Sequence, residues 1–82
     1  MVETLARKGR ILQDAGYAYN FDRMVYFNRK AKKIFSIEFV EDHDENDLLK
    51  GIAEETNEAD WRFYFNSPPS EAVKHEIENV LG

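Results

Sequence analysis

Two aromatic runs separated by a basic segment constrain the fold of this chain more than any other feature. The runs cover residues 24–27 and 34–40, and four of the six residues between them are lysine or arginine. Aromatic and β-branched residues favour strands, and a short polar connection between two such runs is typical of a hairpin. The pattern predicts a β-hairpin onto which the rest of the chain packs.

The expected hairpin begins with a long strand at residues 17–28, with a bend or bulge around residues 20–23, where the sequence is less β-prone. Its second strand is expected at residues 34–41, which alternate aromatic or aliphatic with polar side chains. The connection at residues 28–33 lacks glycine, so a two-residue type I′ turn is disfavoured and a loop of about three to five residues fits better.

The length of this loop decides which aromatic side chains face the core, because a slip of one residue turns every strand side chain to the other face. A three-residue loop pairs Val25 with Phe35, whereas a four-residue loop turns Met24 and Tyr26 inward. The sequence leaves both registers open.

Three segments have the apolar periodicity of helices. They cover residues 2–15, residues 44–53 and the stretch that follows the turn at residues 67–70. Gly16 is expected to end the first helix, because glycine readily adopts positive φ at a helix C-terminus. Asp44 is expected to cap the second helix, because its carboxylate can accept a hydrogen bond from a free backbone N–H.

Residues 61–66 form the third expected strand, since Trp61, Phe63 and Phe65 alternate with polar residues. The complete element order is α-β-β-α-β-α, which predicts a single α+β domain over residues 1–82. The third strand is expected beside the first, which gives a three-stranded antiparallel sheet in the order 2-1-3 with helices packed on it. The residues expected in the core are Phe35, Ile37, Phe63, Val73 and Ile77.

The chain of 82 residues is acidic, with a net charge of −5 that is unevenly divided. Residues 1–33 carry a net charge of +5 and residues 34–82 a net charge of −10. Surfaces of opposite sign favour contact with a second copy or another partner, although a dipolar surface also serves solubility alone. The chain has no cysteine, so it can form no disulfide or thiolate metal site. Without a signal sequence or a transmembrane run, a cytoplasmic location is expected.

The acidic stretch before the second helix matches only the first part of a calcium-binding loop. Asp42, Asp44 and Asn46 have the spacing of its first three ligands. Asp47 stands where that loop needs glycine, and Ala53 stands where it needs a bidentate glutamate. The stretch is therefore expected to be a helix cap, and neither a metal nor a cofactor is predicted.

The two histidines, His43 and His75, are the first candidates for general acid–base catalysis near neutral pH. His43 lies between two aspartates that could orient it, but the chain has no cysteine and no serine in a nucleophile-elbow context. His75 lies off the apolar stripe of its helix. Both are expected on the surface, and the chain is expected not to be an enzyme.

A basic cluster at the hairpin tip indicates nucleic-acid binding as one alternative. Its members are Arg29, Lys30, Lys32 and Lys33. Cations neutralise phosphates, and the neighbouring Tyr26 and Phe27 offer rings on which bases can stack. The sequence pI of about 4.9 argues against non-specific binding. A lysine-rich tip also protects a sheet from edge-to-edge aggregation, which is the simpler interpretation.

A tyrosine-rich sheet face is the second candidate site. Tyr19, Tyr26 and Tyr64 have the strand parity opposite to that of the phenylalanines expected inside. Arg23 and Arg62 are expected with them, and aromatic residues beside arginine are typical of protein interfaces. The face is open if helices cover only the other side of the sheet, and it is ordinary core if helices cover both. The sequence leaves this open.

The favoured function is a small, non-enzymatic protein-interaction module that forms a homodimer, or binds a protein partner, through the tyrosine-rich face. The alternative is a small-molecule or nucleic-acid binding domain that uses the same face together with the basic hairpin. No membrane partner is expected. The sequence identifies neither the biological role nor a specific partner.

Overall fold

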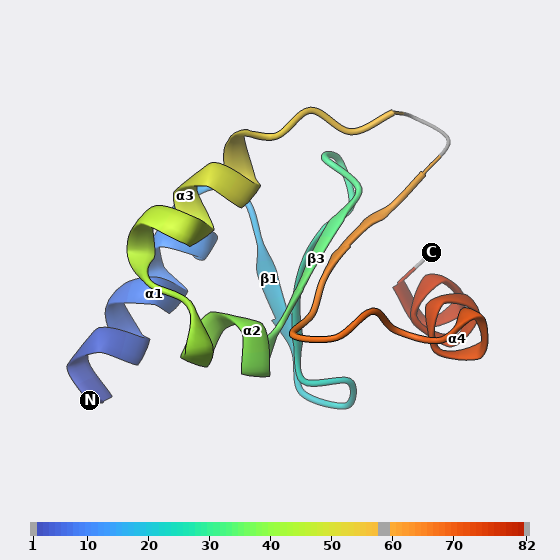
Figure 1. The fold of residues 1–82 in the computed structure, drawn as a ribbon, viewed down its shortest axis with the longest axis horizontal. Helices are drawn as coiled ribbons and strands as arrows, with labels where there is room; N and C mark the ends of the chain where they lie inside the picture. The colour runs from blue at the N-terminus through green and yellow to red at the C-terminus, as the bar shows by residue number, and fades with distance from the viewer. Residues whose placement is uncertain (1, 58–59, 82) are drawn as a thin grey trace.

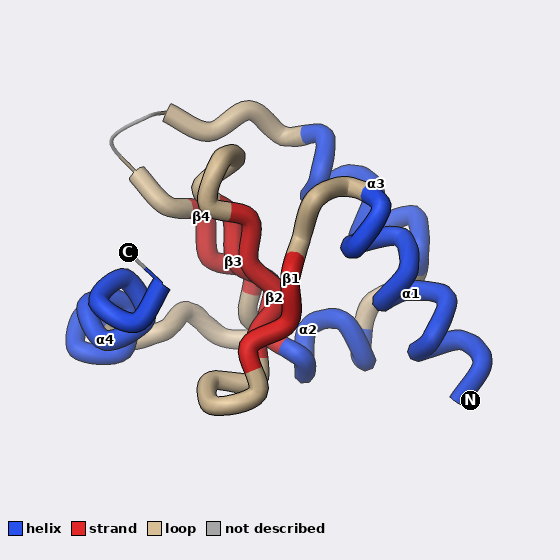
Figure 2. Tube along the Cα trace, turned by 180° about the vertical axis from the view of Figure 1, so that it is seen from behind, coloured by secondary structure: helices blue, strands red, loops and turns tan. Residues whose placement is uncertain are grey.

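The computed structural model describes residues 2–57 and 60–81, in which a four-stranded sheet stands between helices (Figure 1, Figure 2). The elements are α1 (Val2–Asp14), β1 (Ala18–Asn20), β2 (Val25–Asn28), β3 (Lys33–Ser36), α2 (Ile37–Asp42), α3 (Glu45–Ala53), β4 (Arg62–Tyr64) and α4 (Glu71–Leu81). Helices α1, α2 and α3 lie on one side of the sheet, and α4 lies on the other. The predicted α+β class is confirmed, but the sheet differs from the predicted one.

The sheet is mixed, and its strands follow the chain order β1-β2-β3-β4. The pairs β1–β2 and β2–β3 are antiparallel, whereas β4 runs parallel to β3. The predicted three-stranded antiparallel sheet in the order 2-1-3 is therefore wrong. The physical reason is that α2 and α3 return the chain along the sheet, so that β4 starts in the same direction as β3. Because β1 already occupies the other edge of β2, β4 pairs with β3.

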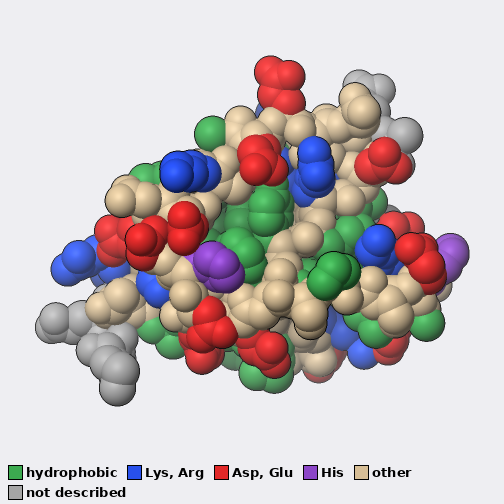
Figure 3. Space-filling model, viewed as in Figure 1, with side chains coloured by type: hydrophobic (Ala, Val, Ile, Leu, Met, Phe, Trp, Pro, Cys, Tyr) green, Lys and Arg blue, Asp and Glu red, His purple; other side chains and the backbone are tan. Residues whose placement is uncertain are grey.

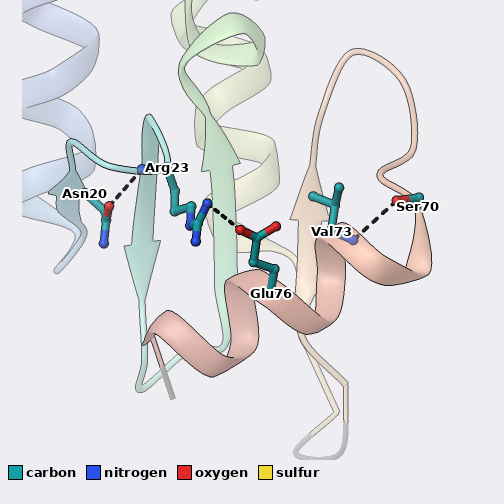
Figure 4. A network of polar contacts seen from close by, with 5 residues as sticks. All are labelled: Asn20, Arg23, Ser70, Val73 and Glu76. Carbon is teal, nitrogen blue, oxygen red and sulfur yellow. Dashed lines mark hydrogen bonds and ion pairs between the residues drawn. The ribbon is translucent and has the colours of Figure 1, made fainter.

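A tight turn at residues 21–24 divides the first expected strand into β1 and β2. The Asn20 Oδ1 atom accepts a hydrogen bond from the backbone N–H of Arg23 at 3.0 Å (Figure 4). Met24 has a φ of 55°, in the left-handed region. An asparagine that bonds to the backbone following it favours a turn, so the expected bend is a complete chain reversal.

The connection between β2 and β3 is the four-residue loop 29–32, and Tyr26 pairs directly with Phe35. The Asn28 Oδ1 atom accepts a hydrogen bond from the backbone N–H of Ala31 at 3.0 Å, which stabilises this loop without glycine. Of the two registers that the sequence leaves open, the structure has the one that turns Tyr26 to the same face as Phe35.

The second expected strand ends at Ser36, and helix α2 follows it directly. The Ser36 Oγ atom accepts a hydrogen bond from the backbone N–H of Phe39 at 3.0 Å, as an N-cap does. The helix places Val40 in the core, whereas Ile37, which was expected in the core, is only half-buried. The strand prediction is wrong beyond this serine because its cap and the burial of one valine favour a helix over strand alternation.

Side-chain chemistry specifies the helix ends as predicted. Gly16 follows α1 with a φ of 98°, and Asp44 accepts a hydrogen bond from the backbone N–H of Asp47 at 2.9 Å. At the start of α4, the Ser70 Oγ atom accepts one from the backbone N–H of Val73 at 3.3 Å (Figure 4). The side chain of Val73, however, is exposed rather than part of the core.

Two apolar clusters, one on each side of the sheet, form the core. The cluster beneath α1, α2 and α3 contains Leu12, Tyr17, Phe35, Val40 and Leu48. The cluster beneath α4 contains Val25, Ile34, Ile77 and Leu81, with Phe63 half-buried against it. Helices therefore cover both faces of the sheet, including the face that carries the tyrosines.

Glycines in α1 and α3 allow these helices to lie directly on aromatic rings. A Cβ atom at Gly9 would lie 2.8 Å from the hydroxyl oxygen of Tyr26. A Cβ atom at Gly51 would lie 2.9 Å from two ring carbons of Phe35 and 3.4 Å from the ring of Tyr64. Glycine weakens a helix by about 1 kcal/mol relative to alanine, and the close approach to these rings offsets that cost.

We expect Gly51→Ala to destabilise the protein by about 1 kcal/mol. Alanine favours the helix by about 1 kcal/mol, but its methyl group must displace the buried ring of Phe35, and such overpacking costs about 1–3 kcal/mol. Gly9→Ala is the matched control, because only the hydroxyl end of the half-buried Tyr26 has to shift there. Urea denaturation measures both variants, and an equal gain in stability for the two would contradict this role of Gly51.

Candidate interaction surface

The three predicted tyrosines lie in one row that crosses the sheet. Tyr19 pairs directly with Tyr26, Tyr26 with Phe35, and Phe35 with Tyr64. The ring centroids of Tyr19 and Tyr26 are 4.9 Å apart, and those of Phe35 and Tyr64 are 4.4 Å apart. The structure therefore brings the tyrosines to one face, as their parity indicates, and adds Phe35 at the centre of the row.

Helices cover most of this row. Tyr26 packs beneath α1 and Tyr64 beside α3, where the Tyr64 hydroxyl donates to the carbonyl of Gly51 at 3.2 Å and lies 2.5 Å from Glu54 Oε2. Burial raises the pKa of Tyr64 well above its usual value, and the hydrogen bond to Glu54 adds to this. Burial also raises the pKa of Tyr26, with a further contribution from Tyr19. The row therefore ends on both edge strands: Tyr64 on β4 packs beside α3, and Tyr19 lies half-buried at the β1 edge.

Lys33, predicted at the solvated hairpin tip, is buried and instead caps α3. Its Nζ atom donates to the carbonyls of Gly51 at 3.0 Å and Ile52 at 2.7 Å, and also to that of Glu54. Burial lowers the pKa of Lys33, and the nearby Glu54 opposes this effect. An ammonium group is favoured among the last carbonyls of a helix. The basic tip that remains consists of Arg29, Lys30 and Lys32.

Lys8 is a second buried lysine, which sequence reasoning did not single out. Its Nζ atom donates to the carbonyls of Val40 at 2.9 Å and Glu41 at 3.2 Å, at the C-terminal end of α2. In the sequence, Lys8 lies in the middle of its helix, where it cannot cap that helix's own C-terminus. This position was the one feature that could indicate a role in capping another helix.

The structure separates Arg23 and Arg62 from the exposed end of the tyrosine row. Arg23 lies in the β1–β2 turn, and its Nη1 atom is 2.6 Å from Glu76 Oε1 of α4, on the other side of the sheet (Figure 4). Arg62 is exposed on β4, at the opposite edge of the sheet from β1. The two arginines therefore do not form one site with Tyr19.

Phe21 is the most exposed large apolar side chain in the described part of the chain, at 83% exposure. Its ring packs edge-on against Tyr19, with a centroid distance of 4.8 Å, and Met24 in the same turn is also exposed. Sequence reasoning placed Phe21 inside a long strand. The signal that could have identified it is its position between Asn20 and Asp22, since both residue types favour turns.

A hollow of about 430 Å³ lies between α1 and β2. It is lined by Leu5, Ala6, Gly9, Arg10, Gln13 and Tyr26. Because Tyr19 packs on Tyr26 and Phe21 packs on Tyr19, the hollow and the exposed ring belong to one continuous surface. We call it the β1-edge surface; it consists of Leu5, Gly9, Tyr19, Phe21 and Tyr26.

Acidic side chains gather over α2 and the start of α3 (Figure 3). Asp42, Asp44 and Asn46 line a hollow of about 470 Å³ together with Arg7 and Lys8. Within residues 2–57 and 60–81, no group of three histidine, cysteine, aspartate or glutamate side chains is placed to hold a metal ion. The stretch caps α3 through Asp44.

The two histidines lie on different sides of the sheet. The ring of His43 stacks on Phe39 with a centroid distance of 3.8 Å, and its Nδ1 atom is 3.0 Å from the Phe39 carbonyl oxygen. His75 is exposed on α4. The fold therefore does not assemble them into one acid–base pair.

Compared with known proteins, the chain matches no protein-family model, no curated protein and no solved structure. In the described part of the chain, no helix is both long enough and apolar enough to cross a membrane.

Tyr17 is a buried residue whose hydroxyl has no hydrogen-bond partner among the described residues. Its ring packs edge-on against Phe35 at a centroid distance of 5.3 Å. Burial raises the pKa of Tyr17 to about 12. The folded protein therefore holds this proton more tightly than the unfolded chain does. Ionisation of Tyr17 does not lower the free energy of unfolding below pH 10, and it lowers it progressively between pH 10 and about 12.

We expect Tyr17→Phe to stabilise the protein at neutral pH by about 1 kcal/mol, because it removes an unpaired buried hydroxyl. The same change should reduce the loss of stability that the wild type suffers above pH 10. Tyr64→Phe is the matched contrast: its hydroxyl is hydrogen-bonded, so we expect a loss of about 0.5–1.5 kcal/mol at neutral pH. Urea denaturation at neutral and alkaline pH tests both, and losses of equal size would contradict the assignment of Tyr17.

Proposed function

We propose that this chain is a small non-enzymatic interaction module that forms a homodimer through the β1-edge surface. The observation that carries the proposal is the exposed ring of Phe21, packed on Tyr19 at the edge of the sheet. The exposed phenylalanine, the half-buried tyrosine and the hollow beside them offer apolar surface that a partner can bury. Aromatic anchors of this kind dominate the binding energy of protein interfaces.

The edge strand β1 favours a second copy as the partner. Only β2 pairs with β1 in the described part of the sheet, so the outer backbone groups of β1 remain open to another strand. Antiparallel pairing of two β1 strands about a twofold axis would give the open backbone groups of both copies the same hydrogen bonds. Because β1 has only three residues, its hydrogen bonds would fix orientation, and the aromatic side chains would supply most of the affinity.

The other charged groups support an interaction role over catalysis or nucleic-acid binding. Lys8 and Lys33 are engaged as caps of helices, and the two histidines lie apart. The turn 21–24 precedes β2 and the basic loop 29–32 follows it, so they lie at opposite ends of this strand (Figure 1). The basic tip and Phe21 are therefore not parts of one binding face.

We expect Phe21→Ser to weaken dimerisation at least about 30-fold, as the loss of an interface anchor does. Its stability in urea should stay within about 0.5 kcal/mol of the wild type, because the ring is exposed in the monomer. Leu49→Ser is the matched control, since Leu49 is 50% exposed on α3, away from β1, and should leave the dimer intact. Sedimentation equilibrium measures all three proteins.

Two results would count against the proposal. A wild type that remains monomeric at high micromolar concentration would exclude self-association through any surface. A dimer that survives Phe21→Ser but is lost in Leu49→Ser would place the interface on α3 instead.

A further inference from the structure

We infer that the two copies exchange their Phe21 rings: each ring enters the hollow between α1 and β2 of the other copy, and Asp22 of each copy pairs with Arg10 of the other. This inference rests on the proposed homodimer and specifies its contacts. It predicts a self-complementary interface, in which one surface supplies both a projecting group and its receptor.

The ring of Phe21 and the hollow lie on the same surface, but the ring does not fill the hollow of its own chain. The ring of Tyr19 stands between them, 4.8 Å from Phe21 and 4.9 Å from Tyr26 of the hollow. Phe21 therefore projects into solvent while the hollow remains open beside it. A second copy related by a twofold axis can fill both hollows at once.

The hollow has the size and lining that an aromatic ring requires. The hollow is open to solvent, and its volume of about 430 Å³ exceeds the roughly 150 Å³ in which an enclosed cavity holds benzene. Leu5 and Ala6 contribute aliphatic groups, Tyr26 contributes a ring, and Gly9 lets α1 lie directly on the Tyr26 hydroxyl. An incoming phenyl ring would contact these carbon atoms together with the side chains of Arg10 and Gln13.

Antiparallel pairing of the β1 edges brings the required parts together. In such a pair, the turn that ends β1 in one copy lies beside the start of β1 in the other. Helix α1 leads directly into that start, so Arg10 and Gln13 of the hollow lie toward the end of α1 that the incoming turn approaches. The direction of the strands is therefore compatible with ring exchange.

The charges next to the ring and the hollow are complementary. Asp22 directly follows Phe21, and Arg10 lines the hollow. Both side chains are exposed, and neither has an ion-pair partner among the described side chains of residues 4–57 and 60–81, whereas Arg23 of the same turn is paired with Glu76. Insertion of Phe21 would bring Asp22 next to the Arg10 of the other copy, and opposite charges at the rim would fix the register.

Charge exchange between copies tests this contact. We expect Arg10→Asp alone and Asp22→Arg alone each to weaken the homodimer about tenfold at low salt, because a twofold interface contains the altered contact twice. In an equimolar mixture of the two variants, every contact of the heterodimer again joins Arg to Asp. The heterodimer should therefore form with an affinity within about twofold of the wild-type dimer, and native mass spectrometry distinguishes it from either homodimer.

Two further variants separate the charge effect and the cavity effect from general effects. Lys30→Asp makes the same charge change on the exposed basic tip and should leave dimerisation within about twofold. Ala6→Trp fills the hollow from an exposed helix position and should weaken the dimer at least about 30-fold while the monomer remains folded in urea titration.

The outcomes distinguish this inference from the proposal on which it rests. If the wild type is a dimer that Phe21→Ser disrupts, but the charge variants show no preference for the heterodimer and Ala6→Trp has no effect, ring exchange is wrong and self-association stands. If the wild type is monomeric, the proposed function itself fails. A heterodimer preferred over both homodimers, together with disruption by Ala6→Trp, supports the exchange.

Discussion

The packing of Phe35 is the contact on which the rest of this fold depends. Its fully buried ring lies 4.4 Å from that of Tyr64, 5.3 Å from that of Tyr17 and 5.8 Å from that of Phe39, so one side chain joins β4, the segment after α1, and α2. Gly51 lets α3 approach the same ring. A chain this small, without cysteine, buries a limited apolar area. Here three elements and the segment after α1 all pack around the ring of Phe35.

Two buried lysines complete this arrangement and limit what the charged residues can do elsewhere. Lys8 donates to the last carbonyls of α2, and Lys33 donates to those of α3. Desolvation of an ammonium group is costly unless hydrogen bonds replace its water, and the carbonyl ends of helices provide those bonds with a favourable dipole. The basic half of the sequence therefore serves partly to hold helices onto the sheet. Among the described residues, Phe21 at the aromatic edge of β1 is the most exposed large apolar side chain.

Signals that act over a few residues could be read from the sequence. Gly16 and Asp44 specify helix ends because a positive φ and a carboxylate acceptor act within one turn. The shared face of Tyr19 and Tyr26 follows from strand periodicity, so two of the five residues of the β1-edge surface were predictable. Phe21 was not, because its exposure depends on where the strand breaks, and a turn between Asn20 and Asp22 competes closely with continued pairing.

The sequence by itself determined the α+β class, the positions of the long helices and the parity of the aromatic residues, since each depends on local periodicity and capping. Tertiary structure alone decided that Ser36 starts a helix, that β4 runs parallel to β3, and that helices cover both faces of the sheet. Each of these features depends on packing between segments that are far apart in the sequence. The outcome depends on which arrangement buries Phe35, Val40 and Leu48 together.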